Sequence, residues 1–188
     1  MATLDGPADA TADGPAYSAT ARLLHWITAI GVLTMIPAGI VMVQLEWGST
    51  LKNNLYDYHR SVGAVLMVLI IVRIAYRLLY PPRPLPSDIP SWQHGIAKFV
   101  HVSLYALLLV NPFIGWVGTS AYPAKITVFW LFELPAIVEK NRPLSDFLLP
   151  IHGYLGLATA ALVVLHLAGV FHHQFIRRDR ILMRMVTG

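Results

Sequence analysis

Four long apolar segments constrain this chain more than any other feature of its sequence. A helix needs about 20 consecutive, mostly apolar residues to cross the hydrocarbon core of a bilayer. The segments that meet this requirement lie at about 21–45, 55–79, 96–120 and 148–175. The chain is 56% hydrophobic and only 13% charged, whereas soluble domains carry about 25% charged residues. We therefore expect an all-α integral membrane protein, a four-helix bundle that crosses the bilayer four times.

The stretches outside the four spans are expected to be a tail and connections. Residues 1–16 contain no basic residue, so they do not resemble the start of a signal peptide. We expect a disordered tail there, before a membrane domain over residues 17–185. The proline-rich run PPRPLPSDIP is expected to be a stiff connector between the second and third spans. The run ITVFWLFELPAIV is apolar but too short to cross a bilayer, and we expect a short helix lying on the membrane surface.

Basic residues predict the orientation of the bundle, because cytoplasmic loops carry an excess of Lys and Arg. If the N-terminus is cytoplasmic, nine of the 14 Lys and Arg residues lie on the cytoplasmic side and five on the outer side. We therefore expect both termini in the cytoplasm. The net charge of +4 comes from residues that flank the apolar runs, so the composition indicates membrane topology and no nucleic-acid partner.

Four histidines occupy matching positions in three of the spans. His152 and His166 are fourteen residues apart in the fourth span. Fourteen steps of about 100° end about 40° short of four full turns, so both side chains face the same way, about 21 Å apart along the axis. His59 lies near the start of the second span at the outer side, level with His152, and His25 lies near the start of the first span at the cytoplasmic side, level with His166. Two neutral imidazoles that face each other across an apolar bundle suit the iron of a b-type haem.

Other cofactors fit these histidines less well. The chain has no cysteine, which excludes disulfides, thiolate-held iron–sulfur clusters and cysteine-linked haem. Zinc usually takes further protein ligands, often cysteine or a carboxylate, and the apolar centres of the spans offer no Asp or Glu. The alternative of a different class is a haem-free structural or transport bundle, in which the histidines only hydrogen-bond packed helices to one another.

The sequence resembles the bacterial cytochrome b561 family of four-span, two-haem membrane cytochromes, which is related to the cytochrome b subunits of formate dehydrogenases and nickel–iron hydrogenases. The matching motifs are LLHW at 23–26, HRSVG at 59–63, VRIAYRLLYPPRP at 72–84, HVSLYALLLVNPFIGW at 101–116, HGYLG at 152–156 and VVLHLAGVFHHQF at 163–175. The resemblance implies two haems b, held by His25 with His166 and by His59 with His152. It also implies a multi-pass protein of the bacterial inner membrane.

The function implied is transfer of single electrons across the membrane, to or from quinone. Histidine on both sides of each iron leaves no vacant position for oxygen or substrate. Some members of the family oxidise superoxide and pass the electron to ubiquinone, so the resemblance also suggests superoxide:quinone oxidoreductase activity. Another option is that the chain is the cytochrome b anchor subunit of a larger dehydrogenase, although the sequence points to no particular partner subunit. Membrane lipid and quinone are the partners that we expect.

Three arginines are expected to serve the haems or a quinone. Arg73 is fourteen residues after His59, so it faces the same side of the helix at the depth of the inner haem. There its guanidinium can pair with a haem propionate or hold a quinone carbonyl. Arg77 lies one turn further toward the cytoplasm, and Arg60 is placed to serve the outer haem.

Two more histidines lie near the cytoplasmic side. His101 begins the third span and competes with His25 as the partner of His166. The family pattern favours His25, which leaves His101 for a propionate or a quinone. His173 is seven residues after His166 and shares its face of the helix. We predict that quinone binds on this cytoplasmic side, where histidines can exchange protons.

Overall fold

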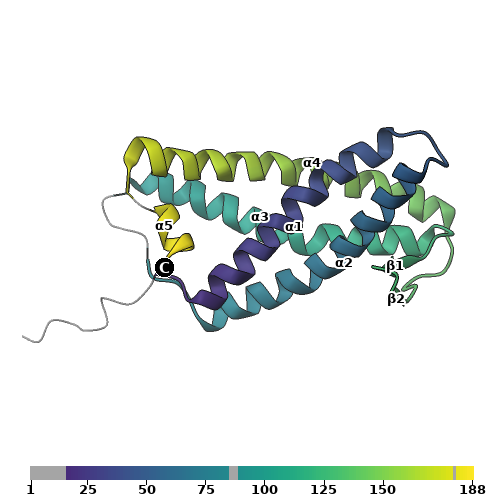
Figure 1. Ribbon diagram of the computed structural model, residues 1–188, viewed down its shortest axis with the longest axis horizontal. Coiled ribbons are helices and arrows are strands. Elements are labelled where there is room, and N and C mark those ends of the chain that lie inside the picture. Colours follow the sequence, from purple (N-terminus) through teal and green to yellow (C-terminus); the bar gives the residue numbers. More distant parts are fainter. Residues whose placement is uncertain (1–15, 85–88, 180) are drawn as a thin grey trace, which may run out of the picture.

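The computed structural model describes residues 16–84, 89–179 and 181–188 (Figure 1). Its elements are, in chain order, α1 Ala19–Gln44, α2 Thr50–Leu79, α3 Ser91–Ala121, β1 Ile126–Val128, β2 Phe132–Leu134, α4 Arg142–Phe171, the π-helix η1 His172–Arg177 and α5 Ile181–Val186. Among the described residues, four helices are long and apolar enough to cross a membrane, which confirms the expected fold class. The tail expected over residues 1–16 lies almost wholly outside the described residues, and so does part of the connector between α2 and α3.

Polar side chains begin three of the four long helices. The side chains of Ser18, Ser49 and Asn141 each accept a hydrogen bond from the backbone N–H three residues further on, at the starts of α1, α2 and α4. Each bond satisfies a backbone donor for which the helix itself has no partner. The start of α3 instead follows Pro90, whose side chain makes no such bond.

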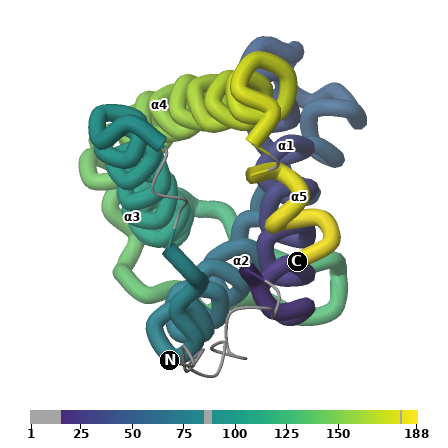
Figure 2. The backbone as a smooth tube through the Cα atoms, turned by 90° about the vertical axis from the view of Figure 1, so that its left-hand side faces the viewer, coloured from purple at the N-terminus to yellow at the C-terminus, as the bar shows by residue number. Residues whose placement is uncertain are grey.

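The bundle consists of two helical hairpins side by side. α1 packs mainly against α2, and α3 packs mainly against α4. Seen along the bundle, the four long helices form a ring, and α5 lies across one end of it (Figure 2). α1 begins and α4 ends at this same end, which we call the termini end. β1 and β2 lie at the opposite end, which we call the hairpin end (Figure 1).

Large apolar side chains cover the outside of the bundle. Four that are more than half exposed, one from each long helix, are Ile30, Val68, Phe99 and Val164. Exposure of such an apolar surface to water over the whole length of a bundle is unfavourable, whereas contact of the same surface with lipid is favourable. The positions buried between the helices include several small or hydroxyl-bearing residues, which allow membrane helices to approach closely.

The expectation of a surface helix over ITVFWLFELPAIV was wrong. The segment forms an antiparallel hairpin, in which Ile126 lies opposite Leu134 and Val128 lies opposite Phe132. Ile126 and Val128 are buried, and Thr127 between them is less so. This alternation has the period of a strand, and all three residues are β-branched, which favours strands over helices.

Candidate functional site

The four histidines paired from the sequence come together in two pairs. The ring centres of His59 on α2 and His152 on α4 are 5.9 Å apart. Those of His25 on α1 and His166 on α4 are 6.4 Å apart, toward the termini end. All four residues are half-buried. Each pair therefore connects α4 to one of the two helices α1 and α2.

The separations of both pairs suit two imidazoles on a single metal ion. Metal–imidazole bonds of about 2 Å, added to the distance from each ring nitrogen to its ring centre, place opposed rings roughly 6–6.5 Å apart. The ring of His101 on α3 is 5.3 Å from that of His166, which is shorter than this spacing. Within the described residues, no group of three or more His, Asp or Glu side chains is arranged to hold a metal ion. Pairs of histidines are therefore the ligand sets that this part of the chain offers.

The ring of His152 is oriented by the backbone of α3. Its Nδ1 lies 2.9 Å from the carbonyl oxygen of Asn111. A carbonyl can only accept a hydrogen bond, so Nδ1 carries the proton and donates. In the neutral ring Nε2 is then the unprotonated nitrogen, which is the form in which a histidine binds a metal.

Two glycines allow the rings to lie directly against neighbouring helices. A Cβ atom at Gly115 of α3 would be 2.9 Å from Cε1 of His152, and a Cβ atom at Gly39 of α1 would be 3.0 Å from Cε1 of His59. The contact at Gly115 is shorter than real Cβ atoms make, and the contact at Gly39 is tighter than nearly all of them, so a larger residue would shift either ring. The positions of both rings at the hairpin end therefore depend on glycine.

A cavity of about 700 Å³ adjoins the pair at the hairpin end. Its wall includes both histidine rings, and most of its other lining residues are apolar side chains of the four long helices. Arg60 and Asn111 are among the polar residues that face it. Pockets that bury a flat organic ligand of moderate size usually measure about 300–1,000 Å³. The site at the hairpin end thus has the size, the ligands and the apolar wall that a haem requires.

The termini-end pair has a more cationic surrounding. The guanidinium of Arg73 lies over the ring of Tyr105, 5.3 Å from its centre. Arg73, Arg77, Tyr105 and Met185 line a small cavity of about 20 Å³. The Nδ1 atom of His25 is buried and makes no hydrogen bond. A buried nitrogen without a partner is uncommon, and a bound ligand or water could supply one.

Of the remaining predicted residues, Arg60 lies at the hairpin end and His173 lies at the termini end. At the hairpin end, a guanidinium nitrogen of Arg60 is 3.5 Å from the carbonyl oxygen of Lys125. At the termini end, His173 lies in η1 and its Nδ1 is 2.6 Å from a carboxylate oxygen of Asp179. Arg177 donates to the same oxygen over 3.1 Å. Single-turn π-helices such as η1 are rare and often occur at functional sites.

The charge of Asp179 is stabilised by its neighbours. Burial raises the pKa of this carboxyl, but hydrogen bonds from His173 and Arg177 outweigh burial and hold the pKa below its usual value. The sequence analysis did not foresee this carboxylate, which gives His173 a partner within its own segment.

The sequence analysis also missed Asn111, Gly39 and Gly115. Only the glycines carried a signal, since both follow a proline within three residues along the same helix. Asn111 contacts His152 through its backbone carbonyl, which any residue type would provide. The sequence does not identify the histidine that each residue contacts, because these contacts depend on how the helices cross.

Comparison with known proteins shows the family to which the chain belongs. The sequence profile of prokaryotic cytochrome b561 matches residues 16–188. Cytochrome b561 homolog 2 of Escherichia coli (strain K12) is 31% identical over 171 residues, which cover 90% of this chain and 90% of that protein. Cytochrome b561 homolog 1 of the same organism is 26% identical over 170 residues, covering 90% and 96%. A probable superoxide oxidase CybB of Yersinia pestis is 27% identical over 170 residues, covering 90% and 95%.

Family membership implies haem b, and the residues at the hairpin end fit that group. They provide two imidazoles at a suitable separation, a ring with its Nε2 unprotonated and a cavity with an apolar wall. The profile and the relatives both span nearly the whole described chain. This multi-pass membrane protein belongs to the prokaryotic cytochrome b561 family of b-type cytochromes.

Proposed function

We propose that this chain holds two haems b and passes single electrons across the bacterial inner membrane, with quinone as a redox partner. The observation that carries the proposal is the presence of two histidine pairs, with ring centres 5.9 and 6.4 Å apart, at two depths of one bundle. His59 and His152 would hold one haem, and His25 and His166 would hold the other. Haem b supplies an iron that gains and loses a single electron reversibly.

The protein's own contribution is orientation and exclusion of water. The carbonyl of Asn111 accepts a hydrogen bond from Nδ1 of His152, which leaves Nε2 of the neutral ring free to bind iron. Gly39 and Gly115 leave room for the two rings. Because histidines would fill both axial positions, no coordination position is open to oxygen or a substrate, and the expected chemistry is electron transfer.

We place the quinone site at the termini end. Arg73 and Arg77 meet there beside Tyr105, and these side chains can donate hydrogen bonds to quinone oxygens. His101 lies beside His166 and can exchange a proton as quinone is reduced. The opposing hypothesis is that the arginines pair only with haem propionates.

Oxidation of superoxide is a second candidate function. It is favoured by the relative from Yersinia pestis, whose name is that of a probable superoxide oxidase. It is also favoured by Arg60, which lines the cavity at the hairpin end and would attract an anion. We place both termini in the cytoplasm, so that this cavity faces the outer side. A cytochrome b subunit that anchors a larger dehydrogenase is the remaining alternative.

Haem content and quinol kinetics test the two parts of the proposal separately. A pyridine haemochrome assay on fully loaded protein should return two haems b per chain, and a value close to one would contradict the dihaem assignment. Anaerobic mixing with a short-chain ubiquinol should then reduce the haems, or the reduced protein should be reoxidised by the matching quinone. Two haems that exchange no electrons with either form would contradict the quinone assignment alone.

A further inference from the structure

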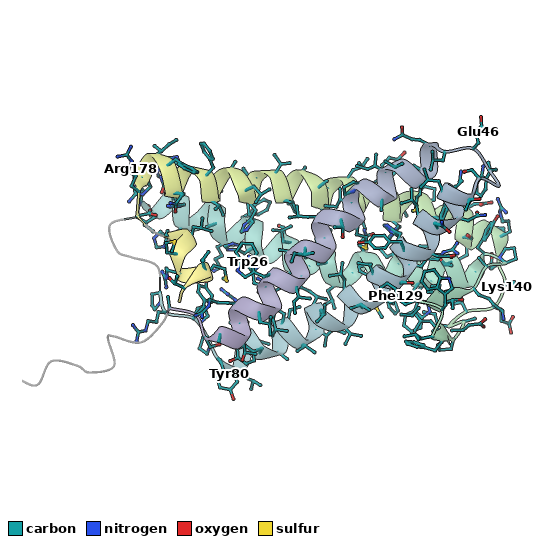
Figure 3. All side chains as sticks on the ribbon, in the orientation of Figure 1. Trp26, Glu46, Tyr80, Phe129, Lys140 and Arg178 are labelled. Atoms are coloured by element: carbon teal, nitrogen blue, oxygen red, sulfur yellow. The ribbon has the colours of Figure 1, made fainter. Side chains whose placement is uncertain are left out.

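The hairpin of β1 and β2 presents an exposed apolar tip. Phe129 is 39% exposed, Trp130 78%, Leu131 81% and Phe132 56%. The strand β1 beneath this tip packs against α2, whereas the side chains of the tip itself remain exposed. Figure 3 shows the labelled Phe129 among a group of side chains at the edge of the hairpin end.

The tip holds its aromatic residues in a backbone conformation that suits them poorly. Phe129 has a φ of 45° and Trp130 has a φ of 60°, and the N–H of Leu131 donates to the carbonyl of Val128 over 2.9 Å. Positive φ at both central residues is the requirement of a type I′ turn, which strongly favours Asn-Gly. Bulky residues with positive φ are outliers, and such strain tends to persist where function requires the side chain. The aromatic residues therefore serve a purpose other than making the turn.

Ser61 fixes the depth of the hairpin along α2. Its Oγ donates to the carbonyl of Thr127 over 3.1 Å and accepts from the N–H of Phe129 over 2.9 Å. The part of α2 before Ser61 is rich in polar residues (TLKNNLYDYHR), and the part that follows is apolar (SVGAVLMVLIIV). From Ser61 to the end of α2 at Leu79, a rise of about 1.5 Å per residue gives about 27 Å, close to the roughly 30 Å of a hydrocarbon core.

This match places Ser61 where α2 passes from the headgroup region into the hydrocarbon core. The hairpin tip is bonded to Ser61, so it lies at the same boundary. Trp and other aromatic residues favour this boundary, because their rings suit lipid while their polar atoms still reach water. At the base of the hairpin, Lys125 and Glu133 form an exposed ion pair of 2.9 Å, which suits the aqueous side.

We infer that residues 129–132 form a lipid-binding anchor, which inserts into the interfacial zone of the bilayer at the hairpin end. The occupant of the exposed tip is phospholipid, because the tip continues the lipid-facing surface of α2 at the level where that surface becomes apolar. Through Ser61, the anchor holds the segment that carries His59 at a constant depth. The inference rests on the membrane spans and does not depend on how many haems are bound or on which redox partner is used.

Site-directed spin labelling tests this inference, because the chain has no native cysteine. Leu131→Cys and Lys125→Cys, each carrying a nitroxide, are compared in phospholipid nanodiscs with the haem-loaded protein. Power saturation measures collisions with oxygen, which concentrates in lipid, and with a nickel chelate, which stays in water. We expect oxygen to dominate at position 131 and nickel at position 125. Nickel dominance at position 131 would overturn the inference, and so would spin–spin broadening there, which would show that a second copy covers the tip.

A matched variant separates the aromatic side chains from the turn. Phe129→Asn combined with Trp130→Gly, in the Leu131→Cys background, installs the sequence that a type I′ turn favours. We expect unchanged haem absorbance, which reports an intact bundle, and a several-fold rise in nickel accessibility at position 131. If accessibility stays at its original value, the aromatic residues are not the anchor. Trp130→Asn alone, at a position where asparagine tolerates positive φ, provides the same comparison should the double variant fail to fold.

Discussion

His152 donates a hydrogen bond from Nδ1 to the carbonyl oxygen of Asn111, 2.9 Å away on the facing helix α3. Gly115, one turn further along α3, leaves the space in which the ring lies. The orientation of the ring is therefore set by the backbone of α3 and by the absence of a side chain, rather than by another polar side chain. This relationship makes the hairpin-end site sensitive to changes on α3 that remove no ligand.

Gly115→Ala should disturb the hairpin-end haem selectively. The new Cβ would lie 2.9 Å from Cε1 and 3.0 Å from Nδ1 of His152, so the ring must move and its bond to Asn111 weakens. A hydrogen bond contributes about 0.5–1.5 kcal/mol, so we expect a midpoint-potential shift of tens of millivolts, or loss of this haem. Gly95→Ala is the matched control, because Gly95 lies on the same helix outside the cavity and its Cβ would meet nothing within 4 Å. Redox titration should distinguish the two variants, and equal effects would contradict the prediction.

Substitution of the four histidines should give two groups of variants. His59→Ala and His152→Ala should both remove the hairpin-end haem, whereas His25→Ala and His166→Ala should both remove the other. Each variant should retain roughly half of the haem, because the two ligand pairs share no residue. Haem quantification with low-temperature difference spectra measures this grouping. Loss of both haems from folded protein in every variant would show that the sites are not independent.

His101→Ala should leave both haems bound. The ring of His101 lies 5.3 Å from that of His166, which is shorter than two axial ligands require, whereas the ring of His25 lies at 6.4 Å. The measurement is the low-spin absorbance of the termini-end haem in His101→Ala and His25→Ala. If His101→Ala abolishes this absorbance while His25→Ala preserves it, the pairing must be reassigned.

Arg73→Gln should slow electron exchange with quinone while both haems stay bound and reducible by dithionite. The substitution would remove the charged hydrogen bonds from Arg73 to a quinone oxygen. Hydrogen bonds to charged groups typically contribute about 1.5–3 kcal/mol. His173→Gln should have the same direction of effect, if His173 takes part in proton exchange beside its Asp179 contact. Stopped-flow reduction by a short-chain quinol measures the rate, and Arg60→Gln serves as the control at the opposite end. A slow rate in Arg60→Gln alone would move the quinone site to the hairpin end.

The attachment of α5 should weaken in acid. Hydrogen bonds from His173 and Arg177 hold the pKa of Asp179 below its usual value, so folding favours the ionised carboxylate. This stabilisation is fully present above the unfolded pKa of about 3.9 and is lost as pH falls through the lower folded pKa. Hydrogen exchange at the amide of Ile181, which donates to Asp179 over 3.3 Å, should lose protection in this window once corrected for intrinsic rates. Asp179→Asn should show weak protection at neutral pH and no further acid-dependent loss.

The membrane spans could be predicted because apolar length alone determines them. Their ends could not, because polar residues continue a helix beyond the hydrocarbon core. The second span was expected from about residue 55, yet α2 begins at Thr50 after the Ser49 cap. The fourth was expected from about residue 148, yet α4 begins at Arg142. In both cases the cap residue, and not the hydropathy, marks where the helix begins.

The approach of the histidine side chains in pairs could also be predicted, because helical period and alternating span direction bring these positions together. Contacts between helices could not. Nothing in the local sequence places Gly39 beside His59 or the Asn111 carbonyl beside His152, since these neighbours depend on crossing geometry. The apolar composition of the segment that contains β1 suggested a membrane-surface helix, whereas the alternation of buried and less buried residues at Ile126–Val128 is that of a strand.

Both histidine pairs take one member from α4, the last long helix to leave the ribosome. A nascent chain that has inserted only α1, α2 and α3 contains His25 and His59, but it has neither His152 nor His166 to oppose them. Chains fold from the N-terminus as they are synthesised, so the α1–α2 hairpin exists in the membrane before either site is complete. Under the proposed ligand pairing, haem capture would be a late event in biogenesis, and it would join two helical hairpins that inserted one after the other. Truncation anywhere before α4 would then leave apoprotein in which neither haem site is complete.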